Sequence, residues 1–266
     1  MKRIHLITLS TLLFFLSACT EKVDIDLSGI DPVVVIEGTV STETDSSFVR
    51  VSLTKDYFDE QSVVPVNDAI VLVFSDNDTA TFNHTTNGIY VPPAGYKGDT
   101  LKQYTLRVLH DGKEYNSTTT LHPMFYVDTN LIFTYAEAAG FLSAGYKVTY
   151  LSIDTRPGEI FTQFRFGQND TLFDQEIFFS SAELVKNALL PFELPFYRPQ
   201  LGDSVMLVFR SFDPPVAKYF IELGNLRSQA PGPFKTPPAN PPTNISGGAL
   251  GYFLATDIKR VNQVVR

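Results

Sequence analysis

The sequence predicts a mainly β protein, with an N-terminal immunoglobulin-like β-sandwich followed by a β-rich domain that carries one or two helices. Three observations lead to this fold class. Short apolar runs with β-strand character recur through the first half, Asn-Gly and Asp-Gly pairs interrupt two of them, and aromatic residues make up 13% of the chain. Aromatic side chains fit the pleated surface of a sheet, and short strands with turn signals at this spacing are typical of a sandwich.

Five segments of the first half have strand character: 33–40, 47–55, 68–76, 79–92 and 102–121. The first is almost continuously β-branched, as in a buried strand, and the second alternates between apolar and polar residues. The pairs Asn87-Gly88 and Asp111-Gly112 predict tight hairpin turns within the last two segments. The first half is therefore expected to contain antiparallel hairpins and no helix.

The second half is less regular. Strands are expected in three segments: 146–180, 203–212 and 249–256. Helices are expected in two segments: 181–189 and 213–229. Asp213 is the expected N-cap of the longer helix, because prolines follow it in the first turn. Residues 230–248 are rich in proline and glycine and are expected to form a loop.

The N-terminus has the pattern of a bacterial lipoprotein signal. Two basic residues precede an apolar stretch of about 13 residues, which suits a signal peptide and is too short to span a bilayer. Residues 16–19, Leu-Ser-Ala-Cys, resemble the lipobox, where cleavage precedes the cysteine. Cys19 would then carry diacylglycerol and an amide-linked acyl chain such as palmitate. The alternative is an ordinary signal peptide with a chance cysteine.

These elements divide the chain into four expected parts: a lipoprotein signal peptide (1–18), an acidic tether (19–29), the immunoglobulin-like sandwich (30–122) and the β-rich C-terminal domain (123–266). The tether is polar and has no usable apolar face, although an irregular first strand is the alternative. His122 and Pro123 mark the expected junction between the two domains. Cys19 is the sole cysteine, so lipidation would leave no thiol for a disulfide.

The composition limits the classes of function. A hydrophobic content of 44% with 19% charged residues indicates a globular body, and the formal net charge is −8. No basic patch is visible, so we expect no nucleic-acid partner. Buried acyl chains would hold the protein at a membrane without a spanning helix.

No catalytic constellation is visible in the sequence, so we expect a protein that is not an enzyme and has no cofactor. His84, His110 and His122 do not share metal-ligand spacing, and no cysteine joins them, so no metal site is expected. Several carboxylates cluster in one stretch: Asp154, Glu159, Asp170, Asp174 and Glu176. A glycan hydrolase would need two of them to converge across a bond, and solvated carboxylates at turns are the simpler interpretation.

Two segments are candidates for docking a partner. Residues 191–199, Pro-Phe-Glu-Leu-Pro-Phe-Tyr-Arg-Pro, carry three rings among three prolines: Phe192, Phe196 and Tyr197. They predict an exposed docking edge or, alternatively, rings that cap the core of the second half. In the proline-rich loop, Asn244 and Ser246 offer side-chain hydrogen bonds beside two glycines. That loop is either a docking site or an internal plug between the two halves.

The order and spacing of several motifs carry a family resemblance: VVVIEGTV, VRVSLTKDY, NDAIVLVFSD, the NGIY…GKEYNSTTT segment and the tail NPPTNISGGALGYFLAT. Together they resemble an uncharacterised lipoprotein family of the Bacteroidota, a domain of unknown function often encoded beside TonB-dependent outer-membrane transporters. The resemblance implies a lipid-anchored outer-membrane protein that serves as an accessory or binding subunit of nutrient uptake. It would face the cell surface, which we favour, or alternatively the periplasm. A cell-envelope structural or adhesion lipoprotein without a transport partner is the alternative.

Overall fold

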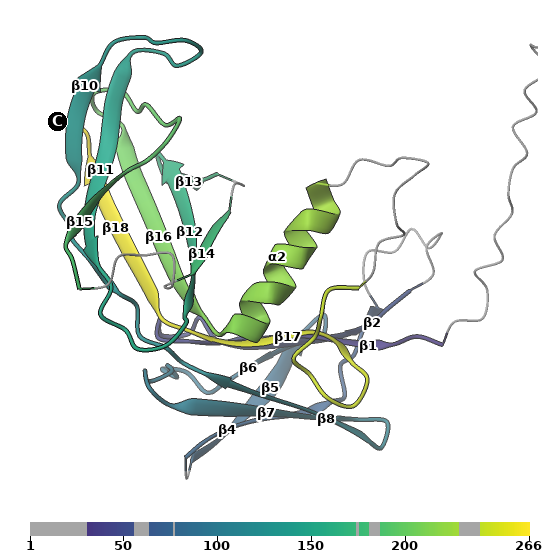
Figure 1. Ribbon diagram of the computed structural model, residues 1–266. Helices are drawn as coiled ribbons and strands as arrows, with labels where there is room; N and C mark the ends of the chain where they lie inside the picture. Colours follow the sequence, from purple (N-terminus) through teal and green to yellow (C-terminus); the bar gives the residue numbers. More distant parts are fainter. Residues whose placement is uncertain (1–30, 56–63, 77, 174–175, 181–186, 229–239) are drawn as a thin grey trace, which may run out of the picture. The chain divides into compact units, whose positions relative to one another are not determined.

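Figure 1 shows the computed structural model, which describes residues 31–55, 64–76, 78–173, 176–180, 187–228 and 240–266. The elements below lie in the unit formed by Pro32–Lys55 and Gln61–Arg266. Strands dominate these residues, and the helix α2 (Pro214–Ser228) packs against them. The predicted mainly β fold is therefore confirmed. Cys19 and the expected tether lie outside the described residues.

The first sheet has nine strands: β1 (Val34–Ser41), β2 (Phe48–Leu53), β3 (Val64–Pro65), β4 (Ile70–Ser75), β5 (Asp78–Thr86), β6 (Ile89–Val91), β7 (Gln103–His110), β8 (Lys113–Thr120) and β17 (Leu250–Thr256). Their order is β17-β1-β2-β6-β5-β4-β7-β8, and β3 pairs with β2. Alternate side chains point inward into one core, which includes Ile36, Val51, Leu106 and Phe253, all fully buried. We call these nine strands, together with the core that they enclose, the first sandwich.

Both predicted hairpin turns are confirmed. Asn87 and Gly88 join β5 to β6 with φ angles of 50° and 70°, and Asp111 and Gly112 join β7 to β8 with 48° and 70°. Positive φ at both central residues is what a two-residue turn needs to match the twist of its strands. These turns are local, so the sequence alone specifies them.

The strand β17 joins the first sheet from the far end of the sequence. It pairs in parallel with β1, from Val35 opposite Leu250 to Ser41 opposite Thr256. The chain just before β17 also bonds β8, the strand at the other end of this order, since the Ser246 amide donates to the Asn116 carbonyl. A segment inside the expected C-terminal domain (123–266) thus completes the core of the first sandwich.

The second sandwich consists of two further sheets. One contains β9 (Tyr126–Val127), β10 (Ile132–Ala136), β11 (Gly145–Ile153) and β15 (Leu190–Glu193). The other contains β12 (Phe161–Gln168), β13 (Thr171–Leu172), β14 (Ile177–Ser180), β16 (Ser204–Phe212) and β18 (Ile258–Val264). Phe164 and Phe209 stack at 4.8 Å in the core between them. The sequence pattern predicted neither β10, β15 nor β18.

The predicted long helix is confirmed as α2, whereas residues 181–186 of the predicted short helix lie outside the described residues. Asp213 stands at the N-cap, since the Ala217 amide donates to its carbonyl at 2.9 Å. Its carboxylate instead accepts hydrogen bonds from the end of β8. Pro215, at the second helical position, supplies no N–H for the cap to accept, and the carboxylate is engaged by Thr119 and Thr120 instead.

Among the described residues, no helix is both long enough and apolar enough to cross a bilayer.

Candidate functional site

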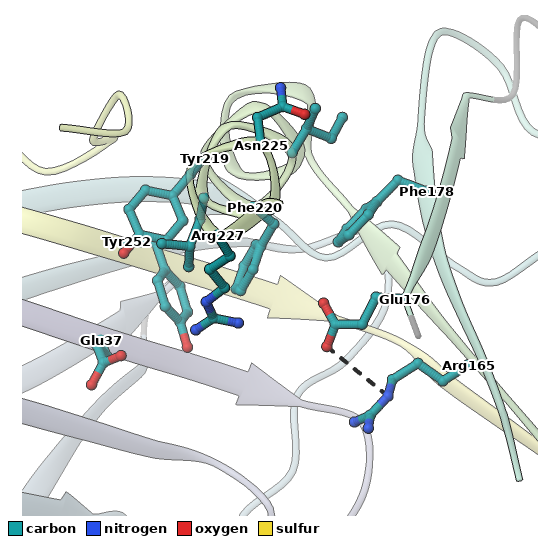
Figure 2. Close-up of a pocket in the computed structure, with 12 residues that line it drawn as sticks. Glu37, Arg165, Glu176, Phe178, Tyr219, Phe220, Asn225, Arg227 and Tyr252 are labelled. Carbon is teal, nitrogen blue, oxygen red and sulfur yellow. Dashed lines mark ion pairs between the residues drawn. The ribbon is translucent and has the colours of Figure 1, made fainter. Parts of the chain in front are cut away.

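A pocket of about 940 Å³ lies beside α2, with walls from that helix and from β1, β12, β14 and β17 (Figure 2). Its volume is at the upper end of the range of about 300–1,000 Å³ that is usual for small-molecule sites. Strands of both sandwiches contribute to the lining, so the pocket depends on the packing of α2 over the strand β17.

Aromatic rings form one wall of the pocket. Phe220 of α2 lies 4.8 Å from Tyr252 of β17 and 6.2 Å from Phe178 of β14, measured between ring centroids. Tyr219 lies 5.3 Å from Tyr252. Burial raises the pKa of Tyr252 to about 12, and the nearby Glu37 carboxylate adds to the shift. Burial also raises the pKa of Tyr219, so both tyrosine hydroxyls stay neutral near pH 7 and can donate hydrogen bonds.

Glu37 reaches this wall because of strand register. In the parallel pair of β1 and β17, Glu37 lies opposite Tyr252, and on the other side of β1 it lies opposite Arg50. Opposite residues project from the same face of a sheet, so the three side chains form one row. Glu37 and Arg50 form an ion pair at 3.4 Å.

Three arginines project from one face of the second sheet of the second sandwich. Arg165 of β12 and Arg260 of β18 both lie opposite Val208 of β16, and Arg210 follows two residues later on β16. Arg260 forms a bidentate pair with Glu43, at 2.6 and 3.0 Å. The partner of Arg165 is Glu176, whose nearest oxygen is 4.0 Å from Nε (Figure 2).

Two of these guanidinium groups retain unused donors. The Nε atoms of Arg165 and Arg210 are buried and have no hydrogen-bond partner among the described residues. The same holds for Oε1 of Gln163, which lies opposite Arg210. Burial lowers the pKa of Arg210, although the nearby Tyr252 phenol opposes the shift. A buried polar atom without a partner is costly, so these atoms favour a hydrogen-bonding ligand or water nearby. Of the three residues, Arg165 lines the pocket.

The pocket can therefore hold a ligand with a flat apolar part and at least one hydrogen-bond acceptor. The rings of Phe178, Tyr219 and Tyr252 offer apolar contact, and the guanidinium group of Arg165 offers donors for a carboxylate. Figure 2 shows that the Arg227 side chain extends from α2 into the same space. Glu37 and Glu176 make the lining neutral overall.

Comparison with known protein families matches residues 20–159 to the family described as Domain of unknown function (DUF4249). The chain belongs to this family. The matched residues begin directly after Cys19 and include most of the first sandwich and the strands β9 to β11. The tail motif at 240–256 lies outside them. A search of curated proteins found no match to this chain.

The docking residues predicted for this DUF4249 chain occupy three different environments. Phe192 lies within β15, pairs opposite Tyr150 of β11 and stacks on its ring at 5.6 Å. Tyr197 is only 6% exposed, and its hydroxyl donates to the Gly167 carbonyl at 3.2 Å. Phe196, between them, is 71% exposed. Phe192 is half-buried, so Phe196 is the most exposed of the three rings and the best placed to contact a partner.

The proline-rich loop makes internal contacts at both predicted positions. The Asn244 side chain makes two hydrogen bonds with the backbone of Phe253. Its Nδ2 donates to the Phe253 carbonyl at 2.8 Å, and its Oδ1 accepts from the Phe253 amide at 2.9 Å, as the backbone of a neighbouring strand would. Ser246 exchanges backbone and hydroxyl hydrogen bonds with Asn116 of β8. These contacts match the alternative of an internal plug that holds β17 in the first sheet.

The clustered carboxylates have separate roles in this DUF4249 chain. Asp154 is buried in a bidentate pair with Arg156, with distances of 2.8 and 3.0 Å. Glu159 accepts a hydrogen bond from Ser180 at 3.0 Å, and Glu176 faces the pocket. Asp170 lies in an exposed turn, and Asp174 lies outside the described residues.

One group of possible metal ligands occurs in the described part of the chain: Asp68, His110 and Asp111, at one end of the first sandwich. The two ring nitrogens of His110 lie 3.3 Å from Asp68 and 3.4 Å from Asp111. Both carboxylates are largely exposed, and exposed acidic groups are common without a bound ion. His84 instead contacts Asn67 at 2.9 Å, and His122 contacts Asp213.

Sequence reasoning did not find the pocket. Its residues come from β1, β12, β14, α2 and β17, which are far apart in sequence, and each of them has an ordinary local role. One signal was present: Glu37 interrupts a run of valines in a strand predicted to be buried. A carboxylate in such a run needs a polar environment on one face of the strand.

Proposed function

We propose that this chain is a lipid-anchored accessory or binding subunit of a TonB-dependent nutrient-uptake system in the outer membrane. The pocket beside α2 carries the proposal, because it combines apolar rings with Arg165, whose buried Nε has no hydrogen-bond partner among the residues that the structure describes. Such a combination supports ligand binding more than a purely structural role. The lipobox at residues 16–19 supports the membrane anchor.

The ligand class follows from the same groups. A carboxylate would accept hydrogen bonds from Arg165, and the attached apolar or aromatic part would contact Phe178 and Tyr252. Carboxylate–guanidinium pairs are strong and directional, so they would fix the orientation of the ligand. We therefore expect small carboxylated nutrients with a planar apolar group.

Ligand binding can be tested by the thermal midpoint of the purified protein. A ligand at about 100 times its dissociation constant stabilises the folded state by about 2.7 kcal/mol, which raises the midpoint measurably. Arg165→Gln should abolish that shift. Arg107→Gln is the matched control, because Arg107 also pairs with a glutamate, Glu114, but lies in the first sandwich away from the pocket. Equal shifts in both variants would contradict this assignment of the pocket.

The transport partner can be tested by purification from native outer membranes in mild detergent. A TonB-dependent transporter that co-purifies with the wild-type chain, and is lost with Cys19→Ala, is the expected result. Protease treatment of intact cells would then test whether the chain faces the cell surface.

A cell-envelope adhesion or structural lipoprotein is the second candidate. The exposed Phe196 favours a surface contact, which such a role would use. Lipidation without any transporter in the purified material, and without a ligand-dependent midpoint, would favour this second function.

A further inference from the structure

The loop between β10 and β11 carries the most exposed aromatic ring among the described residues. Phe141 is 83% exposed and stacks on Phe196, 71% exposed, with ring centroids 5.6 Å apart. Leu142 follows Phe141, and we call these three residues the aromatic tip. In Figure 1 the β10–β11 loop reaches beyond the ends of the other strands of the second sandwich. The tip therefore combines two segments that are 55 positions apart in sequence.

The backbone holds the aromatic tip in place. Ala139 and Leu142 exchange two backbone hydrogen bonds of 3.0 Å, which close the loop. The amide of Tyr146 donates to the Pro199 carbonyl at 2.9 Å, and this bond ties the Phe196 segment to β11. Phe196 itself has a φ of 60°, in the left-handed region that bulky residues rarely occupy. The Phe196 ring is thus held against Phe141 and outside the core.

The polarity changes stepwise away from the aromatic tip. Residues 138–146 contain no charged side chain. At the base of the hairpin, Tyr135 and Tyr146 lie opposite each other, with ring centroids 5.6 Å apart. Along β11 the first charge follows beyond Tyr146, where Lys147 pairs with Glu193 at 3.1 Å, whereas on the β10 side Glu137 lies between Tyr135 and the tip. Along β11 the apolar tip is thus followed by a tyrosine and then by a charged pair, which is the order that suits a bilayer interface.

We propose that the aromatic tip inserts into the interface of a lipid bilayer, so that the second sandwich rests on the membrane surface. This proposal does not depend on a transport partner or on the pocket. The charges at the base of the tip balance, because Lys147 and Arg198 both face Glu193 while Glu137 begins the loop. The whole chain carries −8. We therefore expect insertion into zwitterionic lipid, weak dependence on salt, and weaker insertion when anionic lipid is added.

Fluorescence can test the insertion, because the chain contains no tryptophan. Phe141→Trp places a single fluorophore at the tip of the full-length chain, which is then reconstituted on phosphatidylethanolamine–phosphatidylcholine vesicles. We expect a blue shift of its emission and loss of most of its intensity when the lipids carry brominated acyl chains. The matched control is Leu101→Trp, at a position in the first sandwich that is 77% exposed. Its emission should stay that of a residue in water.

A second substitution tests the role of the stacked ring. In the Phe141→Trp background, Phe196→Asp should reduce quenching by brominated lipid about tenfold or more, whereas Leu101→Asp should leave it unchanged. Near-ultraviolet circular dichroism confirms that the fold is retained. Three results would overturn the proposal: a tip fluorophore that remains exposed to water on vesicles, quenching that Phe196→Asp does not change, or a blue shift without lipid that disappears on dilution. The last result would mean that the tip contacts a second copy of the chain.

Discussion

Asp213 ties the start of α2 to the first sandwich. Its carboxylate accepts hydrogen bonds from Thr119 Oγ1 at 2.8 Å and from the Thr120 amide at 2.6 Å, and it also pairs with His122. Burial alone would raise the pKa of Asp213, but the bonds from His122, Thr120 and Thr119 hold it below its ordinary value. The ionised form is therefore the one that the fold stabilises.

This pKa shift predicts how stability depends on pH. A carboxyl group with a lowered pKa in the folded state contributes stability above its ordinary pKa of about 4, and this contribution is lost as the pH falls through the folded-state pKa. At pH 7, Asp213→Asn should lower the free energy of unfolding by about 2 kcal/mol, because it removes hydrogen bonds to a charged group. Urea unfolding should show this difference shrinking below about pH 4. Asp111→Asn, in an exposed turn, is the control, and an equal loss there would contradict the role of Asp213.

Phe196 and Tyr197 are adjacent, but we predict that they contribute very differently to stability. Tyr197→Ala should cost about 3 kcal/mol, because it leaves a cavity in the second core and removes the bond to Gly167. Phe196→Ala should change stability by about 0.5 kcal/mol or less, because the ring is mostly in solvent. Chemical denaturation of the two variants measures both values. A large loss with Phe196→Ala would show that this ring belongs to the core.

The sequence could not distinguish these two rings. Both lie among prolines in a stretch without clear periodicity, and their burial depends on partners elsewhere in the chain. Gly167 on β12 accepts the bond from Tyr197, whereas Phe141 on the β10–β11 loop stacks on Phe196. The hypothesis of an exposed docking edge and its alternative, rings that cap the core, therefore each describe part of this short stretch.

Local patterns predicted the elements that are specified locally. Hairpins with Asn-Gly or Asp-Gly turns and the α2 helix were found because turn residues and helical periodicity are written in neighbouring positions. The strands β15 and β18 were missed for physical reasons. Pro191 lies inside β15, and a proline within a segment argues against a strand. The strand β18 reads Ile-Lys-Arg-Val-Asn-Gln-Val, and only Val261 of these residues is fully buried. Tertiary pairing, not local pattern, decides both.

The pairing of β17 with β1 depends on Gly251. Its φ is 102°, and a Cβ atom at this position would lie 2.0 Å from the Ile36 carbonyl oxygen. We predict that Gly251→Ala lowers the free energy of unfolding by about 3 kcal/mol, because backbone strain and a steric clash add together. Gly95→Ala separates the two causes, since Gly95 also has a positive φ, 81°, but no atom lies within 4 Å of its Cβ position. Equal effects in thermal unfolding of the two variants would contradict the close approach to Ile36.

At the scale of the whole molecule, the two sandwiches share the end of the chain. β17 completes the first sandwich, and after the single residue Asp257 the chain continues as β18 of the second. The Asp257 carboxylate accepts hydrogen bonds from Thr42 Oγ1 at 2.8 Å and from the Met124 amide at 2.7 Å. This arrangement links residues that the sequence assigned to separate domains. Pattern alone could not reveal it, because a parallel partner more than 200 positions away leaves no local signal.

The shared strand predicts that the expected first domain, residues 30–122, is not stable alone. A fragment of residues 30–122 lacks Phe253 and Ala255, which are fully buried in the first core, and it exposes the long β1 edge. Unpaired edges and a missing core strand favour aggregation. We expect this fragment to show no cooperative unfolding by circular dichroism, and expect it to regain a cooperative transition when mixed with residues 123–266. The same mixture with Gly251→Ala in the second fragment should fail to assemble, because the clash with Ile36 blocks insertion of β17. A monomeric 30–122 fragment that unfolds cooperatively without its partner would show that β17 is dispensable for the first sandwich.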